Sequence, residues 1–165
     1  MTEIVFRPEL EADAAAVDQL AWTVFGPGMT ARAAYVLREG RASEPACGFV
    51  AYDGDCLVGT VRQTQICIGD QVGLMLGPLA VLCGYKSRGI GRELMRLSVG
   101  AARQVANERG WSWIVLVGDH AYYRSFGFEP VKPGSVILPR PADPARILIC
   151  PFDRDGLPPA GLARS

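Results

Sequence analysis

A basic, glycine-containing segment, KSRGIGR at residues 86–92, directly precedes a stretch with helical periodicity. The first turn of a helix holds backbone N–H groups without intrahelical partners, and the peptide dipoles add partial positive charge there. Glycine at positions 89 and 91 leaves room for an anion to reach those donors. We therefore predict a phosphate-binding cradle that consists of Lys86, Ser87, Arg88, Gly89, Ile90, Gly91 and Arg92.

The two glycines also fit a simple turn into the helix, because short Gly-x-Gly patterns are common. Their spacing matches neither the longer glycine fingerprint of dinucleotide-binding folds nor the Gly-Lys-Ser/Thr ending of nucleoside-triphosphate loops. The segment by itself indicates a polyanion and no particular ligand.

The apolar stretch before the cradle, residues 72–82, is typical of a strand covered on both faces, and it contains Gly77-Pro78. Proline cannot donate to a sheet ladder, so we expect the strand to bulge or to lose a neighbour there. The backbone groups freed in this way would pair with an extended ligand that carries amides. An edge strand that tolerates a proline is the alternative.

The segment GDHAYYRSFGF, residues 118–128, follows a second buried strand. Its adjacent tyrosines, Tyr122 and Tyr123, lie on a short expected helix and cannot face the same way. One is free to pack while the other offers its hydroxyl. Ordinary core packing is the alternative for each of them.

In this order, LGPLAV, KSRGIGRELM and AYYRSFGF resemble the GNAT superfamily of acyl-CoA-dependent N-acetyltransferases. The resemblance is strong from about Leu74 to Pro130 and faint on either side. It implies acetyl-CoA as cosubstrate, with the pyrophosphate held by Lys86 and by backbone N–H groups of residues 87–91. It also implies that the pantetheine arm pairs with Leu79, Ala80 and Val81, and that Tyr123 is the catalytic general acid.

Three positions depart from the family pattern: Lys86 replaces Gln or Arg, Ser87 a frequent Gly, and Cys83 a frequent Pro. Lys86 still acts on phosphate as a point charge, although it cannot form the bidentate hydrogen bonds to two oxygens that Arg forms. Ser87 keeps its backbone N–H, while its side chain narrows the approach. We expect binding of CoA to survive these changes.

The implied reaction is direct attack of an amine on the thioester. A backbone N–H near Val81 would stabilise the oxyanion, and Tyr123 would donate to the leaving thiolate. Asp119 and His120 are candidate bases; alternatively, Asp119 caps the short helix and His120 is a loop residue. Cys83 stands beside a cationic helix start, but it has no sequence-adjacent histidine, so direct transfer is preferred to an acyl-enzyme.

Hydrophobic periodicity predicts strands at residues 4–7, 48–52, 57–68, 72–82, 113–117, 136–138 and 146–150. Helices are expected at residues 11–25, 30–38 (capped by Thr30), 88–109 and 122–126. The predicted core stripe of the long helix is Ile90, Leu94, Leu97, Ala101 and Val105. This order predicts an α/β (α+β) fold with residues 88–109 as the central crossover helix. The resemblance further implies a GNAT-like mixed sheet of about six to seven strands flanked by helices.

We assign residues 1–150 to a single acetyltransferase domain and the Pro-, Gly- and Ala-rich residues 151–165 to a flexible or surface-lying tail. Because 17 basic residues balance 17 acidic ones, neither nucleic acid nor a membrane is an expected partner. The N-terminus lacks the pattern of a secretion signal, and the five scattered cysteines fit reduced thiols, which favours the cytoplasm. One histidine and no CxxC spacing argue against a metal site.

The predicted function is transfer of an acetyl group from acetyl-CoA to an amine acceptor, a small molecule or a peptide; a homodimer is left open. One alternative is a non-catalytic acyl-CoA-binding or sensing domain. Another is a different phosphate-ligand enzyme, such as a nucleotide binder, which leaves GPLAV and YYRSFGF unexplained. The acceptor is expected between residues 17–37 and the closing strands, beside Trp22, Phe25, Arg32 and Tyr35.

Overall fold

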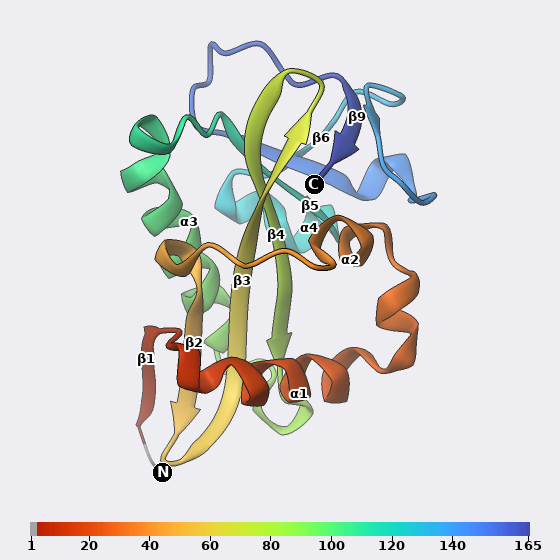
Figure 1. The fold of residues 1–165 in the computed structure, drawn as a ribbon. Coiled ribbons are helices and arrows are strands. Elements are labelled where there is room, and N and C mark those ends of the chain that lie inside the picture. Colours follow the sequence, from red (N-terminus) through yellow and green to blue (C-terminus); the bar gives the residue numbers. More distant parts are fainter. Residues whose placement is uncertain (1–2) are drawn as a thin grey trace.

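The computed structural model describes residues 3–165, which form a mixed sheet with helices against both faces (Figure 1). Seven strands follow one another in the order β1-β2-β3-β4-β5-β8-β6, and β9 pairs with β3 and β7 off this path. The strands are β1 Ile4–Pro8, β2 Phe49–Asp53, β3 Cys56–Ile68, β4 Gln71–Val81, β5 Trp113–Val117, β6 Glu129–Pro130, β7 Val136–Ile137, β8 Ile147–Pro151 and β9 Gly161–Arg164. The α-helices are α1 Ala14–Phe25, α2 Ala33–Arg38, α3 Ile90–Arg109 and α4 His120–Tyr123. The predicted fold class is confirmed.

Side chains of the central strands alternate between two cores, one on each face of the sheet. Leu74 and Leu76 of β4 belong to the core that α3 covers, whereas Met75 between them belongs to the core that contains Leu37 of α2. Helix α1 contacts β3 and β4 and lies on the same side as α2 (Figure 1). The sheet is therefore enclosed by α3 on one face and by the N-terminal helices on the other.

Strand β4 has a continuous neighbour on one side and a short one on the other. It pairs with β3 antiparallel from Gln71 to Val81, with a register shift that leaves Gly77 and Pro78 opposite Arg62. Its parallel pairing with β5 covers Leu74 and Met75 alone within residues 3–165. The expectation that the strand bulges or loses a neighbour at Gly77-Pro78 is confirmed, and the structure shows both. Past this point β4 and β5 diverge.

The predicted crossover helix is α3, which connects the parallel strands β4 and β5 and ends at Gly110 in the left-handed conformation. The predicted core stripe is right for Ile90 and Leu94 but wrong further along the helix. Leu97, Ala101 and Val105 are half-buried, and the buried positions are instead Met95, Ser98, Val99, Ala102 and Ala106.

A polar contact accounts for the orientation of α3. The side-chain amide of Gln63 in β3 donates to the Ser98 hydroxyl at 2.8 Å, and that hydroxyl donates to the carbonyl of Cys47 at 2.6 Å. These bonds hold Ser98 against the sheet, and the small side chains of Ala102 and Ala106 continue the same face. Hydrophobicity alone would not select a serine as a core position.

The second short helix begins later than expected. Its first residue is Ala33, preceded by Arg32 without a side-chain cap, so Thr30 does not cap it. Thr30 lies instead in a 3-10 turn over Pro27–Ala31, and its hydroxyl donates to the carbonyl of Pro27 at 3.2 Å. A local turn bond thus replaces the predicted cap.

Residues 161–164 of the C-terminal segment, which was expected to be a flexible or surface-lying tail, form a strand. Strand β9 pairs Ala163 with Ile68 and Arg164 with Cys67 of β3, and Ala163 is buried. This edge of β3 is open because the pairing with β2 ends at Val61. Backbone groups along the exposed half of a long strand require partners, and β9 supplies them.

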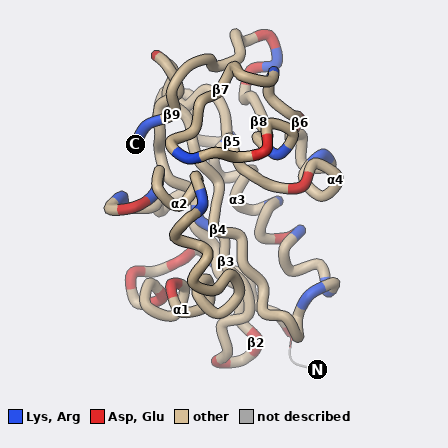
Figure 2. Tube along the Cα trace, turned by 90° about the vertical axis from the view of Figure 1, so that its right-hand side faces the viewer, with Lys and Arg blue, Asp and Glu red and all other residues tan. Residues whose placement is uncertain are grey.

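Charged residues of both signs are distributed along the chain, and neither sign gathers over one whole side (Figure 2). In the part of the chain that the structure describes, no helix combines the length and the apolar character that crossing a membrane requires.

We predict that Gly73→Ala destabilises the fold, because a Cβ there would lie 2.4 Å from the Trp113 ring and 2.6 Å from its carbonyl oxygen. The added methyl group would push β4 away from β5, at a cost of about 1–3 kcal/mol in the free energy of unfolding. Urea unfolding measures this. Gly100→Ala on α3 is the matched control: it has open space around its Cβ and should stabilise by about 0.5–1 kcal/mol. A Gly73→Ala variant as stable as the parent chain would contradict the packing described.

Candidate functional site

The divergence of β5 from β4 leaves backbone groups of β4 facing a gap. The N–H of Leu82 donates to the carbonyl of Val58 in β3 at 2.9 Å. Hydrogen bonding alternates along an antiparallel ladder, so Ala80 also faces β3, and Leu79 and Val81 face the opposite side. Leu79 and Val81 are therefore placed to pair with an extended ligand, whereas the expected third residue, Ala80, directs its backbone to the neighbouring strand.

The start of α3 provides donors for an anion. Gly89 precedes the helix in the left-handed conformation (φ 80°), and no side chain caps it. The N–H of Glu93 donates to the Gly89 carbonyl at 3.0 Å, so the N–H groups of the three residues between them lack helical partners. Arg96 pairs with Glu93 at 2.6 Å and lowers the pKa of that carboxyl, which offsets the negative charge in the first turn.

A cavity of about 480 Å³, here called the cradle cavity, connects this helix start with β4. Most of the predicted cradle residues line it together with two residues of the gap: Lys86, Ser87, Gly89, Ile90, Gly91 and Arg92, with Leu79 and Val81. Arg88 is not part of this lining, because its guanidinium lies over the ring of Tyr85, 4.8 Å from the centroid. The hydroxyl of Tyr85 in turn donates to Asp53 at 2.9 Å.

A second cavity, of about 690 Å³, lies where β4 and β5 diverge and is here called the gap cavity. Its walls come from residues 76–79 of β4, residues 116–119 at the end of β5, and α2. It shares Phe25, Leu79 and Tyr122 with the cradle cavity. The anion donors and the unpaired strand edge thus lie along one continuous path.

The two adjacent tyrosines point in different directions, as expected. Tyr123 is half-buried and packs on Phe128, and its ring passes so close to Gly118 that a Cβ there would lie 2.5 Å away. Tyr122 is 43% exposed, and its hydroxyl lies 2.8 Å from where a Cβ on Gly91 would stand. Tyr122 therefore reaches the start of α3, and Tyr123 faces the gap cavity.

Tyr123 has the properties of a hydrogen-bond donor. Burial raises the pKa of its hydroxyl to about 12, with Arg146 acting in the opposite direction. The group is therefore protonated at neutral pH, and it forms no hydrogen bond with any other residue between 3 and 165. A thiol has a pKa of about 8.5, so complete proton transfer from Tyr123 to a thiolate is uphill by a pKa gap of about 3.5. Donation of a hydrogen bond to the developing negative charge carries no such cost.

The two candidate bases have other partners. Asp119 accepts a hydrogen bond from the N–H of Ala121 at 3.1 Å and so caps α4, as the alternative interpretation expects. His120 is the first residue of α4, and its Nε2 lies 2.8 Å from Oε2 of Glu129. Asp119 lines the gap cavity, whereas His120 lines neither of the two cavities.

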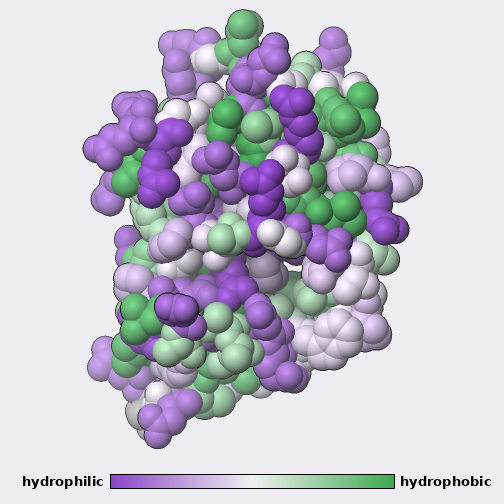
Figure 3. All heavy atoms as spheres, in the orientation of Figure 1, coloured by the Kyte–Doolittle hydropathy of each residue, from purple (hydrophilic) through white to green (hydrophobic). Residues whose placement is uncertain are grey.

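A third cavity, of about 480 Å³, lies on the side of α1 and α2 and is here called the outer cavity. The same face is visibly hollowed between the two helices in Figure 3. The outer cavity meets the gap cavity at Met29, Arg38, Gly77 and Pro78. Of the residues expected near an acceptor, Trp22 and Tyr35 line the outer cavity, and Phe25 and Arg32 line the gap cavity.

Sequence reasoning did not single out the five charged residues that line the outer cavity: Asp18, Arg38, Glu39, Arg41 and Arg62. Charged side chains at such positions are typical of a solvated surface, and only the tertiary structure places them around one cavity. Among the described residues, no cluster of three or more His, Cys, Asp or Glu side chains is placed to hold a metal ion. Cys83 is exposed and lines none of the three cavities.

Residues 44–130 match the family model for an acetyltransferase (GNAT) domain. The uncharacterized N-acetyltransferase YhbS of Escherichia coli (strain K12) is 30% identical over 129 residues, which cover 76% of this chain and 74% of YhbS. The crystal structure of E. coli YhbS in complex with CoA has a TM-score of 0.75 at 25% identity, covering 99% of this chain and 90% of that one. A GNAT family acetyltransferase from Brucella melitensis, solved with acetyl-CoA, has a TM-score of 0.66 at 25% identity, covering 100% and 97%.

We predict that Ser87→Gly stabilises the protein. Ser87 adopts φ 63°, a left-handed conformation that costs a residue with a Cβ about 1–2 kcal/mol. Glycine removes this cost but gains conformational freedom when unfolded, so the net gain in the free energy of unfolding should be up to about 1 kcal/mol. Urea unfolding measures it, with Ser43→Gly as the control, because Ser43 has no positive φ to relieve and should lose stability. A loss of stability in both variants would rule out strain at Ser87.

Proposed function

This chain belongs to the GNAT acetyltransferase family, and we propose that it transfers the acetyl group of acetyl-CoA to an amine acceptor by direct attack. The amine nitrogen forms a bond to the thioester carbonyl carbon, and the carbon–sulfur bond then breaks. The amine gives up one proton, and CoA leaves as a free thiol. No covalent acyl-enzyme is part of this proposal.

The observation that carries the proposal is the unpaired edge of β4 beside the uncapped start of α3. A diphosphate suits the helix start, because backbone N–H groups and the helix dipole both favour negative charge there. An extended arm with amide groups suits the gap, because Leu79 and Val81 direct their backbone groups into it. CoA joins these two chemical features in one molecule. The YhbS and Brucella structures that resemble this chain contain CoA and acetyl-CoA, respectively, which supports the same ligand here.

We assign roles to the residues that line this path. Lys86 and Arg92 supply charge to the diphosphate, and the backbone N–H groups of residues 90–92, which lack helical partners, supply hydrogen bonds. Leu79 and Val81 pair with the pantetheine arm, which brings the thioester to the gap cavity. An N–H on this edge of β4, that of Leu79 or Val81, stabilises the oxyanion formed by amine attack. Tyr123 donates a hydrogen bond to the leaving sulfur.

Acyltransfer is favoured over a non-catalytic binding or sensing domain, because the family and the compared relatives are acetyltransferases. Tyr123 lines the gap cavity, and its hydroxyl has no hydrogen-bond partner within residues 3–165, which also supports a catalytic role over binding alone. We also propose a reducing compartment, the cytoplasm, since all five cysteines are free thiols.

The test is release of free CoA thiol from acetyl-CoA with a panel of amines. Tyr123→Phe should lower kcat by about 10²-fold or more, the usual effect of removing one hydrogen-bond donor to a developing negative charge, while the Kd for acetyl-CoA stays nearly unchanged. Tyr52→Phe is the control, because its hydroxyl donates to Asp13 at 2.8 Å and Tyr52 lines none of the three cavities, so it should affect stability and not kcat. Unchanged turnover in Tyr123→Phe would remove Tyr123 from the mechanism.

A further inference from the structure

Arg38, the last residue of α2, lies at the junction of the gap cavity and the outer cavity. Its Nη1 is 2.7 Å from where a Cβ on Gly77 would stand, so the guanidinium rests directly on the bulge of β4. The thioester arm approaches this bulge from the cradle side, along Leu79 and Val81. An acceptor that enters through the outer cavity reaches the same point from the side of α1 and α2.

The guanidinium of Arg38 has no anionic partner. Within residues 3–165, no hydrogen bond or ion pair reaches its side chain. Burial is the main cause that lowers the pKa of Arg38 to about 10; Tyr35 acts in the opposite direction, and the nearby positive charges of Arg32 and Arg62 contribute to the lowering. Arg38 is still charged at neutral pH, so the structure holds a partly buried cation among other cations.

The neighbouring arginines are already engaged, which distinguishes them from Arg38. Arg62 binds both Glu9 and Asp18, with 2.7 Å between its Nη1 and Oδ1 of Asp18. Arg32 lies over the ring of Phe25, 5.2 Å from the centroid. Arg41 and Arg146, like Arg32, form no ion pair within residues 3–165, but each of these three lines only one of the two cavities, whereas Arg38 lines both.

The carboxylates around the junction do not compensate that charge. In the gap cavity, Asp119 accepts from the N–H of Ala121, and Asp143 accepts from the N–H of Ala145 at 2.9 Å, so both cap short turns. In the outer cavity, Glu39 is exposed and makes no ion pair in the part of the chain that is described. An unpaired guanidinium in a partly desolvated position is costly, and a ligand carboxylate would remove that cost through two parallel hydrogen bonds.

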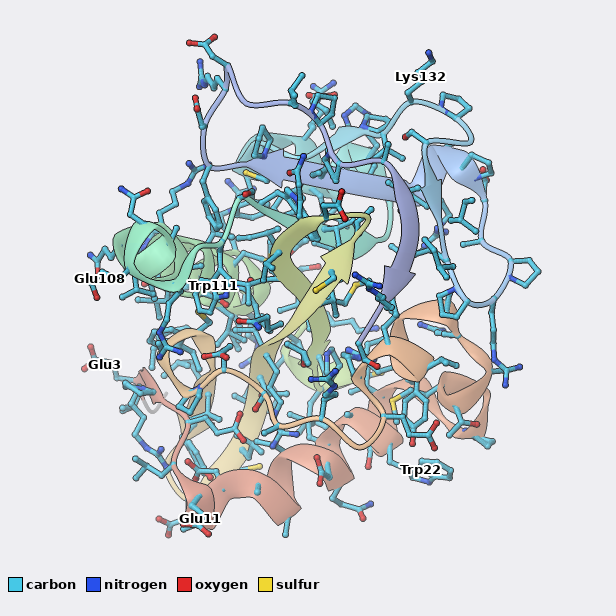
Figure 4. All side chains as sticks on the ribbon, turned by 45° about the horizontal axis from the view of Figure 1, so that its top comes forward. Glu3, Glu11, Trp22, Glu108, Trp111 and Lys132 are labelled. Atoms are coloured by element: carbon cyan, nitrogen blue, oxygen red, sulfur yellow. The ribbon has the colours of Figure 1, made fainter. Side chains whose placement is uncertain are left out.

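We propose that Arg38 binds a carboxylate of the acceptor, so that the acceptor is a small amine that also carries a carboxylate. This inference rests on the proposed acetyltransfer, because it places the acceptor opposite the thioester. Arg38 is the one charged residue within residues 3–165 that lines both cavities, and its planar guanidinium matches the two oxygens of a carboxylate. The outer cavity and its hollowed face (Figure 3) give such a molecule access to Arg38. Figure 4 shows Trp22 projecting from α1, and this residue lines the same cavity.

The experiment compares matched acceptors that differ only in the carboxylate. Each amino acid in a panel of α-, β- and γ-amino acids is assayed beside its primary amide, which keeps the amine and removes the negative charge. The enzymes are the parent chain, Arg38→Gln, Arg38→Lys and Arg154→Gln. Arg154 is the matched control, because it is an exposed arginine of the C-terminal segment that lines none of the three cavities.

We expect the parent chain to prefer the carboxylate form of its best acceptor at least 10-fold in kcat/KM. Arg38→Gln should lower kcat/KM for carboxylates by roughly 10- to 100-fold, as loss of a charged hydrogen-bond pair does, and leave the amides nearly unchanged. The kcat/KM of Arg38→Lys for carboxylates should lie between those of the parent chain and Arg38→Gln, since lysine keeps the charge but cannot donate two parallel hydrogen bonds. Arg154→Gln should match the parent chain. The Tm of Arg38→Gln should be unchanged or higher, because an unpaired charge is removed.

Equal activity on acids and amides, or an equal loss on both in Arg38→Gln, would overturn the role of Arg38 and leave acetyltransfer intact. A fall in the Tm of Arg38→Gln that accompanies loss of all activity would also overturn it, in favour of a structural role. Failure of every amine of either class to release CoA thiol would instead overturn the proposed function itself. Binding of acetyl-CoA, measured by calorimetry, should be the same in all four proteins.

Discussion

The pairing of β4 with β5 over Leu74 and Met75, and its loss beyond them, is the constraint on which the site depends. Gly77 and Pro78 interrupt the ladder, because proline lacks the N–H that a central strand requires. Pairing with β3 continues past the bulge and holds Leu79 to Val81 in an extended conformation. The edge of β4 that pairs with β3 thus stays extended, while the edge toward β5 has no protein partner. A ligand that contains amides can form hydrogen bonds with this second edge.

The crossover helix places the anion donors next to that edge. Because β4 and β5 are parallel, the chain must cross the sheet between them, and α3 begins shortly after β4 ends. Packing of Ile90 and Leu94 in the core fixes the first turn of α3, so its N–H groups have a constant position relative to Val81. On the opposite face, α1 and α2 enclose the bulge and bring Arg38 against Gly77. A cosubstrate and an acceptor can therefore approach the same backbone position from different sides.

The features of the site that depend on residues close together in the chain could be predicted from the sequence. Gly77-Pro78, the basic turn at residues 86–92 and the long periodic helix each depend on neighbours in the chain, and each was found where it was expected. Features that depend on contacts between residues far apart in the sequence were not predicted. Ser98 is buried because it forms hydrogen bonds with Gln63 and Cys47. Arg88 does not line the cradle cavity because its guanidinium lies over the ring of Tyr85. Arg38 is placed between the two cavities by its contact with Gly77. Strand β9 was missed because its partner edge lies on β3, a segment remote in sequence.

Amide hydrogen exchange, resolved by residue with and without saturating CoA, tests the central claim most directly. In the free protein the N–H of Leu82 is bonded to β3, and that of Ala80 faces β3 as well, so both should exchange slowly, while those of Leu79 and Val81 should exchange faster. CoA should slow exchange at Leu79, Val81 and the first turn of α3, and leave Ala80 and Leu82 nearly unchanged. Bound CoA without protection at Leu79, Val81 and residues 90–92 would contradict the account.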